Sequence, residues 1–178
     1  MITLASRSPQ RRAILTQLGV EFEVVEPDVE ELSAGNPREV VVENALRKAR
    51  SVEGSRVLGV DTDVVLDGRV FGKPASVDAA REQLLALSAR VHEVFSGIAL
   101  KEGESERTAV SVTRVHFRSL DPSLLDWYLA SGEWEGRAGG YAIQGRGAAL
   151  VERIEGDFWN VVGLPVPELL KLAPDLAQ

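Results

Sequence analysis

Hydroxyl and guanidinium side chains are concentrated near the start of the chain, in the run Leu-Ala-Ser-Arg-Ser-Pro-Gln-Arg-Arg at residues 4–12. The apolar residues before this run and the helical spacing after it predict a strand that leads into a helix. Ser8 can cap that helix with Pro9 in its first turn, which turns the positive helix end toward the tip of the strand. Arg11 and Arg12 add guanidinium groups, which match phosphate oxygens two at a time. The run therefore predicts a phosphate site, and a solvated, capped surface helix is the alternative.

Carboxylates and lysines further along the chain extend this chemistry. Asp61 follows the apolar run 57–60 directly, and we expect it at the tip of a strand, where an acid is costly unless a partner uses it. Glu31 lies in an acidic segment after a predicted strand, while Lys48 and Lys73 lie on a helix and after a strand. Two carboxylates without histidine suffice for a hard cation such as Mg²⁺ that also contacts phosphates. Taken singly, Glu31 and Lys48 are ordinary surface residues, so the prediction depends on the whole set.

Composition excludes several kinds of protein. The 178 residues include no cysteine, so a disulfide framework, a zinc-thiolate site and a thiol nucleophile are excluded. Neither the Walker loop nor the Gly-x-Gly-x-x-Gly pattern occurs. The net charge of −7 argues against nucleic acid as a partner. The first residues lack the apolar core of a signal peptide and no run is long enough to span a membrane, so we expect a cytoplasmic location and no membrane partner.

Periodicity and turn residues predict the elements that must position these side chains. The expected helices begin after Ser8, at Pro37 (to about residue 52), at Val77 (to Leu87), after Asp121 (to Leu129) and close to the end of the chain, around residues 169–172. The expected strands are 21–25, 56–60, 64–66, 92–100, 109–118 and 149–154. Asp67-Gly68 is expected as a hairpin turn before a strand that stops at Gly72, and 92–100 is expected to be antiparallel to 109–118. This order predicts an α/β fold in one domain, residues 1–178, with a two-lobed mixed sheet, flanking helices and a central cleft.

Seven short blocks occur in one order along nearly the whole chain, and together they make the sequence resemble the Maf family (septum formation protein Maf), whose members are nucleoside triphosphate pyrophosphatases. The blocks are Leu-Ala-Ser-x-Ser-Pro-x-Arg-Arg at 4–12, Glu30-Glu31, Arg47-Lys48-Ala49, Gly59-x-Asp61-Thr62, Gly72-Lys73-Pro74, Gly140-Tyr141-x-Ile143-Gln144-Gly145 and Val162-Gly163-Leu164-Pro165.

The resemblance implies a fold like that of the inosine triphosphate pyrophosphatases, with the nucleotide in the cleft. It also implies hydrolysis of a nucleoside triphosphate to the monophosphate and pyrophosphate with a divalent cation, Mg²⁺ or Mn²⁺. By position, Asp61 would be the general base and would hold the metal together with Glu31. The residues around the phosphates would be Ser8, Arg11, Arg12, Lys48 and Lys73.

Three positions bear on the choice of base. The subgroup of the family that acts on dTTP and UTP resembles this chain in Thr62 and in Gln144, whereas the 7-methyl-GTP subgroup has glutamine and glutamate there. After Pro9 the two subgroups have arginine and tryptophan, and this chain has Gln10. We therefore expect a dTTP/UTP pyrophosphatase that serves nucleotide-pool housekeeping. A 7-methyl-GTP pyrophosphatase and a nucleotide-binding regulator of septum formation are the alternatives, and a homodimer is left open.

Overall fold

A mixed sheet of seven strands runs through the computed structural model, which describes residues 1–177. The hydrogen-bonded order is β2-β1-β3-β5-β6-β7, with β4 paired to β3. β1 is parallel to β2 and β3, whereas β4 and β7 are antiparallel to β3 and β6. The predicted α/β class, with a mixed sheet and flanking helices, is confirmed.

The strands are β1 (Ile2–Ala5), β2 (Phe22–Val25), β3 (Val57–Leu66), β4 (Arg69–Phe71), β5 (Val91–Glu102), β6 (Ser105–Phe117) and β7 (Val151–Glu155). The helices are α1 (Pro9–Gln17), α2 (Pro37–Arg50), α3 (Val77–Leu87), α4 (Pro122–Leu129), α5 (Phe158–Val162) and α6 (Val166–Leu172), with short 3₁₀ turns at Ala138–Gly140, Arg146–Leu150 and Pro174–Ala177.

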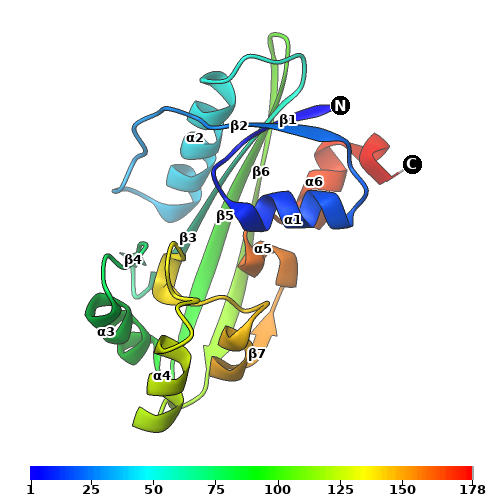
Figure 1. Ribbon diagram of the computed structural model, residues 1–178. Coiled ribbons are helices and arrows are strands. Elements are labelled where there is room, and N and C mark those ends of the chain that lie inside the picture. The colour runs from blue at the N-terminus through cyan, green and yellow to red at the C-terminus, as the bar shows by residue number, and fades with distance from the viewer. Residues whose placement is uncertain (178) are drawn as a thin grey trace. The chain divides into compact units, whose positions relative to one another are not determined.

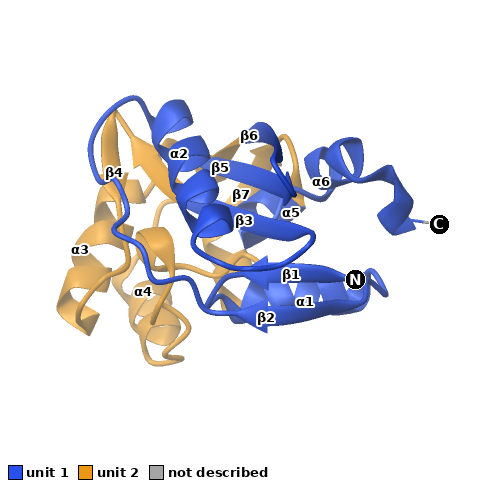
Figure 2. Ribbon diagram, turned by 90° about the horizontal axis from the view of Figure 1, so that it is seen from above, with its two compact units in different colours: residues 1–62, 95–111, 159–178 blue, residues 63–94, 112–158 orange. Residues whose placement is uncertain are grey.

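Contacts divide the chain into two compact units, coloured blue and orange in Figure 2. Unit 1 contains residues 1–62, 95–111 and the chain from Trp159 on, and unit 2 contains residues 63–94 and 112–158. The long strands β3, β5 and β6 each contribute residues to both units. A central cleft between two lobes stays a prediction.

Unit 1 has two apolar clusters, one on each face of its strands. The first joins β1, β3 and β5 to α1 and α6, and the second joins them to α2, which Figure 1 shows on the side away from α1. Neighbouring residues of β3 belong to different clusters, because Leu58 and Val60 lie in the first cluster and Val57 lies in the second. The alternation is the period of two expected of a strand that is buried on both faces.

α2 lies unusually close to the sheet because two strand residues opposite it are glycines. A Cβ atom on Gly59 of β3 would lie 2.0 Å from the main-chain oxygen of Ala45, and one on Gly97 of β5 would lie 2.2 Å from that of Val41. Both distances are shorter than any tolerated contact. Glycine at these positions therefore sets the distance between α2 and the strands.

Helix caps agree with the predictions from sequence. Ser8, Asn36 and Asp121 each accept a hydrogen bond from a main-chain N–H in the first turn of α1, α2 and α4, and proline follows each of them. Asp67 and Gly68 both have positive φ, as a type I′ hairpin between β3 and β4 requires.

The predicted break between strands 56–60 and 64–66 is wrong. β3 is continuous from Val57 to Leu66, so Asp61 lies inside a strand and not at its tip. β3 is paired to β1 only as far as Gly59, and beyond that point it remains next to β5 and turns back into β4. The strand that does end near Asp61 is β1, because Ala5 is the last residue of β1 in the pairing.

Other boundaries differ by a few residues. β5 and β6 extend to a two-residue turn with Gly103 at positive φ, so the predicted loop 101–105 is mostly strand. The predicted strand 149–154 begins at Val151, after a 3₁₀ turn, and the short helix α5 was not predicted. α2 ends at Arg50, about one half-turn before the predicted end.

Unit 2 has a buried histidine within an aromatic cluster. His92 is 1% exposed, a hydrogen bond of 2.7 Å joins its Nε2 to Tyr141 Oη, and its ring meets those of Phe117 and Tyr141 edge-on. Nδ1 makes no hydrogen bond with any residue from 1 to 177. Burial, with a smaller effect from His116, lowers the pKa of His92 to about 4. His92 is therefore neutral at pH 7.

The close approach of α2 predicts a large penalty for a side chain at Gly97. We expect Gly97→Ala to lower the free energy of unfolding by about 2–3 kcal/mol, because either the helix or the strand must shift. Urea denaturation measures the difference. Gly72→Ala is the matched control, since a Cβ there meets no atom within 4 Å, and it should change stability by less than about 0.5 kcal/mol. Equal effects of the two substitutions would contradict the explanation.

Burial of neutral His92 predicts that acid weakens the fold. The unfolded histidine takes up a proton below its ordinary pKa of 6.5, and the folded one does so only near 4, so stability falls as the pH falls through this window. We expect the wild type to lose up to about 3 kcal/mol more than His92→Phe between pH 7 and pH 4. Urea unfolding at several pH values measures both curves, and parallel curves would refute the assignment.

Candidate active site

The start of α1 has the conformation that the sequence predicts. Ser8 Oγ accepts a 3.4 Å hydrogen bond from the main-chain N–H of Arg11, and Ser8 donates its own hydroxyl to Gln10 Oε1 at 3.0 Å. Ser6 Oγ, just after β1, accepts from the N–H of Ser8 at 3.1 Å. Hydrogen bonds between neighbours therefore fix the turn between β1 and α1.

Arg11 points into unit 1 and not into solvent. Its Nε donates to the carbonyl oxygen of Gly163 at 2.8 Å, Nη1 donates to Ser6 Oγ at 3.1 Å and Nη2 donates to Thr62 Oγ1 at 3.1 Å. These three acceptors are neutral, so the direct contacts of Arg11 do not neutralise its charge. Burial lowers the pKa of Arg11, and the negative charges of Asp61 and Glu31 partly oppose this. The group still remains a cation at neutral pH.

On the opposite face of β3, a buried carboxylate meets a buried lysine. Asp61 and Lys48 are both 5% exposed, and Lys48 Nζ donates to Asp61 Oδ1 at 2.6 Å. Asn44 Nδ2 donates to the other oxygen, Asp61 Oδ2, at 2.9 Å. Asn44 and Lys48 are four residues apart in α2 and therefore share one face of the helix. The two hydrogen bonds fix the plane of the carboxylate.

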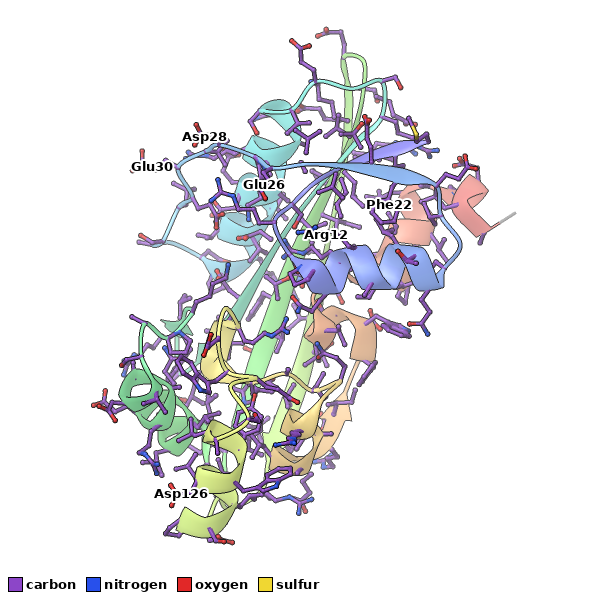
Figure 3. All side chains as sticks on the ribbon, in the orientation of Figure 1. Arg12, Phe22, Glu26, Asp28, Glu30 and Asp126 are labelled. Atoms are coloured by element: carbon purple, nitrogen blue, oxygen red, sulfur yellow. The ribbon has the colours of Figure 1, made fainter. Side chains whose placement is uncertain are left out.

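Glu31 completes this group from a segment without regular structure. Its Oε1 lies 3.0 Å from Lys48 Nζ, so one ammonium group contacts two carboxylates. In Figure 3, Glu26, Asp28 and Glu30 follow one another along the chain that leads to Glu31, and all of these acidic residues are exposed. Unit 1 therefore brings together three of the predicted site residues, namely Glu31, Lys48 and Asp61.

Thr62 connects the two faces of β3. Because neighbouring strand residues point to opposite faces, Asp61 faces α2 and Thr62 faces α1. Thr62 Oγ1 accepts from Arg11 and lies 2.8 Å from Ser96 Oγ of β5. The Asp-Thr pair of the sequence thus contacts both the Lys48 group and the Arg11 group.

The remaining predicted site residues are not part of these two groups. Arg12 is half-buried, and its Nη2 donates to the carbonyl oxygen of Arg7 at 3.2 Å. Gln10 is half-buried in the first turn of α1. Lys73 and Gln144 belong to unit 2 and are exposed. The roles of these residues around a nucleotide stay predictions.

Sequence analysis did not identify Asn44 or Ser96 as part of this site. Asn44 is 1% exposed in α2, and Ser96 is fully buried in β5. A polar residue on the buried face of α2, next to Val41 and Ala45, was the available signal for Asn44, since a buried amide needs partners. Ser96 gave no such signal, because single serines are common in strands.

The donor set of this site suits a hard cation that substrate oxygens also bind. Within residues 1–177 no three histidine, cysteine, aspartate or glutamate side chains are grouped closely enough to form a metal site on their own. Glu31 and Asp61 offer carboxylate oxygens without histidine, as Mg²⁺ prefers, and Mg²⁺ sites commonly use one or two carboxylates together with phosphates and waters. The residues therefore fit a metal that is held jointly with a nucleotide.

The candidate site lies in an α/β protein near the end of the parallel strand β1, and the end of such a strand is a common place for anionic ligands. The chain belongs to the Maf family, described as "Maf-like protein", which it matches over residues 1–176. The resemblance stated from the sequence blocks is therefore confirmed.

Three relatives with the name dTTP/UTP pyrophosphatase are similar along nearly their whole length. That of Symbiobacterium thermophilum is 45% identical, with 96% of this chain and 91% of the relative covered. That of Dictyoglomus thermophilum is 44% identical, with coverages of 96% and 93%, and that of Thermotoga maritima is 46% identical, with coverages of 93% and 84%.

A solved structure, protein VC0702 from Vibrio cholerae, has a TM-score of 0.33 and 14% identity, and the match covers 73% of this chain and 66% of that one. Among the helices of residues 1–177, none has the length and apolar character needed to cross a membrane.

Three hydrogen bonds to three separate segments predict a structural penalty at Arg11. We expect Arg11→Lys to lower the free energy of unfolding by about 2–4 kcal/mol, because an ammonium group cannot reproduce the guanidinium fork and leaves buried acceptors unpaired. Urea denaturation at neutral pH measures the loss. Arg12→Lys is the matched control, since the hydrogen bond from Arg12 to the carbonyl oxygen of Arg7 is exposed, and its effect should stay within about 0.5 kcal/mol. If Arg11→Lys left the free energy of unfolding unchanged, the three hydrogen bonds would contribute nothing to stability.

Proposed function

We propose that the protein is a nucleoside triphosphate pyrophosphatase that hydrolyses dTTP and UTP to the monophosphate and pyrophosphate. The observation that carries the proposal is the buried Asp61 carboxylate, held at one oxygen by Lys48 and at the other by Asn44. Membership of the Maf family and the names of relatives at 44–46% identity support the same reaction.

Asp61 has the features of a general base for the attacking water. A carboxylate offers about four lone pairs, and the two hydrogen bonds to Lys48 and Asn44 use one on each oxygen. The remaining lone pairs can accept the proton of a water molecule, and the fixed plane of the carboxylate limits where that water lies. Such orientation in line with the leaving oxygen is a large part of catalysis in phosphoryl and nucleotidyl transfer.

The cations would neutralise the phosphates. Arg11 supplies a fixed charge whose direct partners are neutral, and the hydroxyl of Ser8 lies in the same turn of the chain. Arg12, Lys48 and Lys73 are the other groups that we assign to the phosphates. Preorganised charges of this kind stabilise the negative charge that develops on the leaving pyrophosphate.

A divalent cation, Mg²⁺ or Mn²⁺, would be held by Glu31 and Asp61. When bound, it would polarise the phosphate oxygens and lower the pKa of a water molecule. Lys48 contacts both carboxylates and offsets part of their mutual repulsion in the absence of the metal.

We assign the choice of base to Gln10, Thr62 and Gln144. Thr62 is the best fixed of the three, through Arg11 and Ser96. Gln10 accepts a hydrogen bond from Ser8, so its amide nitrogen is the end that is available for a ligand. A cytoplasmic location is a part of the proposal that rests on the sequence alone, and a homodimer is left open, as before.

Pyrophosphate release from a panel of nucleoside triphosphates tests the reaction. With Mg²⁺ present, we expect UTP and dTTP to be cleaved faster than CTP, GTP and 7-methyl-GTP. A preference for 7-methyl-GTP would replace the pyrimidine assignment with the alternative from the same family. Absence of release from every nucleotide would leave a nucleotide-binding regulator as the better description.

The role of Asp61 predicts a severe loss on neutralisation. We expect Asp61→Asn to lower kcat for UTP by about 10³-fold or more, because the amide cannot accept the proton of the water. Asp28→Asn is the matched control, since Asp28 is an exposed acid in the segment that leads to Glu31, and its kcat should remain within about twofold. Steady-state kinetics with a coupled pyrophosphate assay measure both variants. Activity of Asp61→Asn near that of the wild type would remove Asp61 from the reaction.

A further inference from the structure

The buried side chain of Asn44 forms three hydrogen bonds, all of them to residues outside its own helix. It is 1% exposed in α2, where the buried neighbours Val41, Ala45 and Ala49 are apolar and Lys48, one turn away, is charged. An apolar residue would suit such a face better, since a buried amide is costly unless all its groups are paired. The buried amide must therefore be explained by the groups with which it forms hydrogen bonds.

The partners of Asn44 are one main-chain residue and the carboxylate of Asp61. Oδ1 accepts the N–H of Leu32 at 2.7 Å, and Nδ2 donates to the carbonyl oxygen of Leu32 at 3.0 Å and to Asp61 Oδ2 at 2.9 Å. Both hydrogens of Nδ2 and one lone pair of Oδ1 are thus used. A single side chain joins the loop and the carboxylate.

Leu32 lies next to Glu31, in a stretch that has no hydrogen-bonded strand or helix to hold it. Residues 26–33 have no regular secondary structure. Side chains hold this stretch instead, because Arg7 donates to the carbonyl oxygen of Pro27 at 3.4 Å and Arg47 donates to that of Glu30 at 3.0 Å. The contact at Leu32 differs from these two because it pairs both main-chain groups of one residue and also reaches Asp61.

Of the two hydrogen bonds to the Asp61 carboxylate described above, loss of the amide would leave the one from Lys48 to Oδ1. A carboxylate held at one oxygen can rotate about its Cβ–Cγ bond, whereas one held at both oxygens cannot. An error of a fraction of an ångström in the position of a base lowers the rate without preventing substrate binding.

We infer that Asn44 is a positioning residue for the reaction, which fixes the Asp61 carboxylate and the segment carrying Glu31 as one hydrogen-bonded unit. This inference rests on the proposed function, because it assigns to Asn44 the orientation of the proposed base.

Asn44→Leu tests the inference, since leucine has a similar volume and forms none of the three hydrogen bonds. We expect kcat for UTP to fall by about tenfold or more, because the lost bond is one to a charged group, while KM for UTP stays within about twofold. A readout independent of turnover is the exchange of the Leu32 amide hydrogen, which should become at least about tenfold faster.

Asn44→Asp separates the two halves of the contact and serves where Asn44→Leu fails to fold. Its carboxyl group retains an oxygen that accepts the N–H of Leu32, but it lies against Asp61 Oδ2. Two carboxyl groups so close share one proton, so Asp61 is no longer a fully ionised base. We expect slow exchange at Leu32, as in the wild type, together with a fall in kcat of about tenfold or more.

Asn36→Ala is the matched control on the same helix. Asn36 caps α2 by accepting from the N–H of Arg38 and is exposed, so its removal weakens the helix without touching Asp61. Its kcat should stay within about twofold of the wild type at a temperature where circular dichroism shows every variant folded.

The outcomes separate this inference from the proposed function. If the wild type releases no pyrophosphate, the proposed function fails and the inference about catalysis fails with it. If the wild type is active and either Asn44 variant, when folded, retains kcat within twofold, Asn44 does not position the base and the inference alone is overturned. An equal loss of kcat in Asn36→Ala would also overturn it, because the effect would then follow helix stability.

Discussion

The negative charge of Asp61 lies inside the protein, and the surrounding structure makes this burial tolerable. An isolated carboxylate at this depth would cost several kcal/mol, so partners must come close to it. Lys48 and Asn44 provide the partners, and both are on α2. Their side chains reach Asp61 because Gly59 and Gly97 let the helix lie against the strands without an intervening Cβ. The glycines, the helix and the charge pair therefore belong to one constraint.

The same strand arranges the second charged group on its other face. Thr62 follows Asp61, and the period of two in a strand sends its side chain toward α1, where it accepts from Arg11. The two groups interact electrostatically through the strand, because the charges of Asp61 and Glu31 raise the pKa of Arg11 against the effect of burial. Asp61 and Thr62 thus place a carboxylate and the guanidinium group of Arg11 on opposite faces of β3, and the two charged groups make no direct contact.

Features set by local interactions could be predicted from the sequence, and those set by strand pairing could not. Ser8, Asn36 and Asp121 cap helices through bonds to residues two or three positions away, so their roles follow from neighbouring residues. Asp61 was expected at a strand tip because the polar run 61–63 interrupts an apolar one. The strand continues because it lies next to β5, which begins at Val91, far beyond the end of β3 in the chain.

The residues of the candidate site also divide into those that could be predicted from the sequence and those that could not. Arg11, Lys48 and Asp61 were found from their types and from the family blocks, whereas Asn44 was missed. Its significance comes from Leu32 and Asp61, which are twelve and seventeen residues away along the chain. The direction of Arg11 could not be predicted either, since a guanidinium at the start of a capped helix is usually solvated. Burial and the distant carbonyl oxygen of Gly163 decide that direction.

The assignments of Lys48 to phosphate and of Glu31 to metal depend on each other. Lys48 has three N–H donors, and three acceptors surround it, namely Asp61 Oδ1, Glu31 Oε1 and the carbonyl oxygen of Val60 at 3.4 Å. To bind a phosphate oxygen, the ammonium group must give up one of them. Glu31 is the partner that can leave, because its side chain is 52% exposed and its carboxylate is hydrated again when it separates from Lys48. Release of Glu31 would free a donor on Lys48 for phosphate and a carboxylate for a cation in the same step, while Asp61 remains held by the buried contacts.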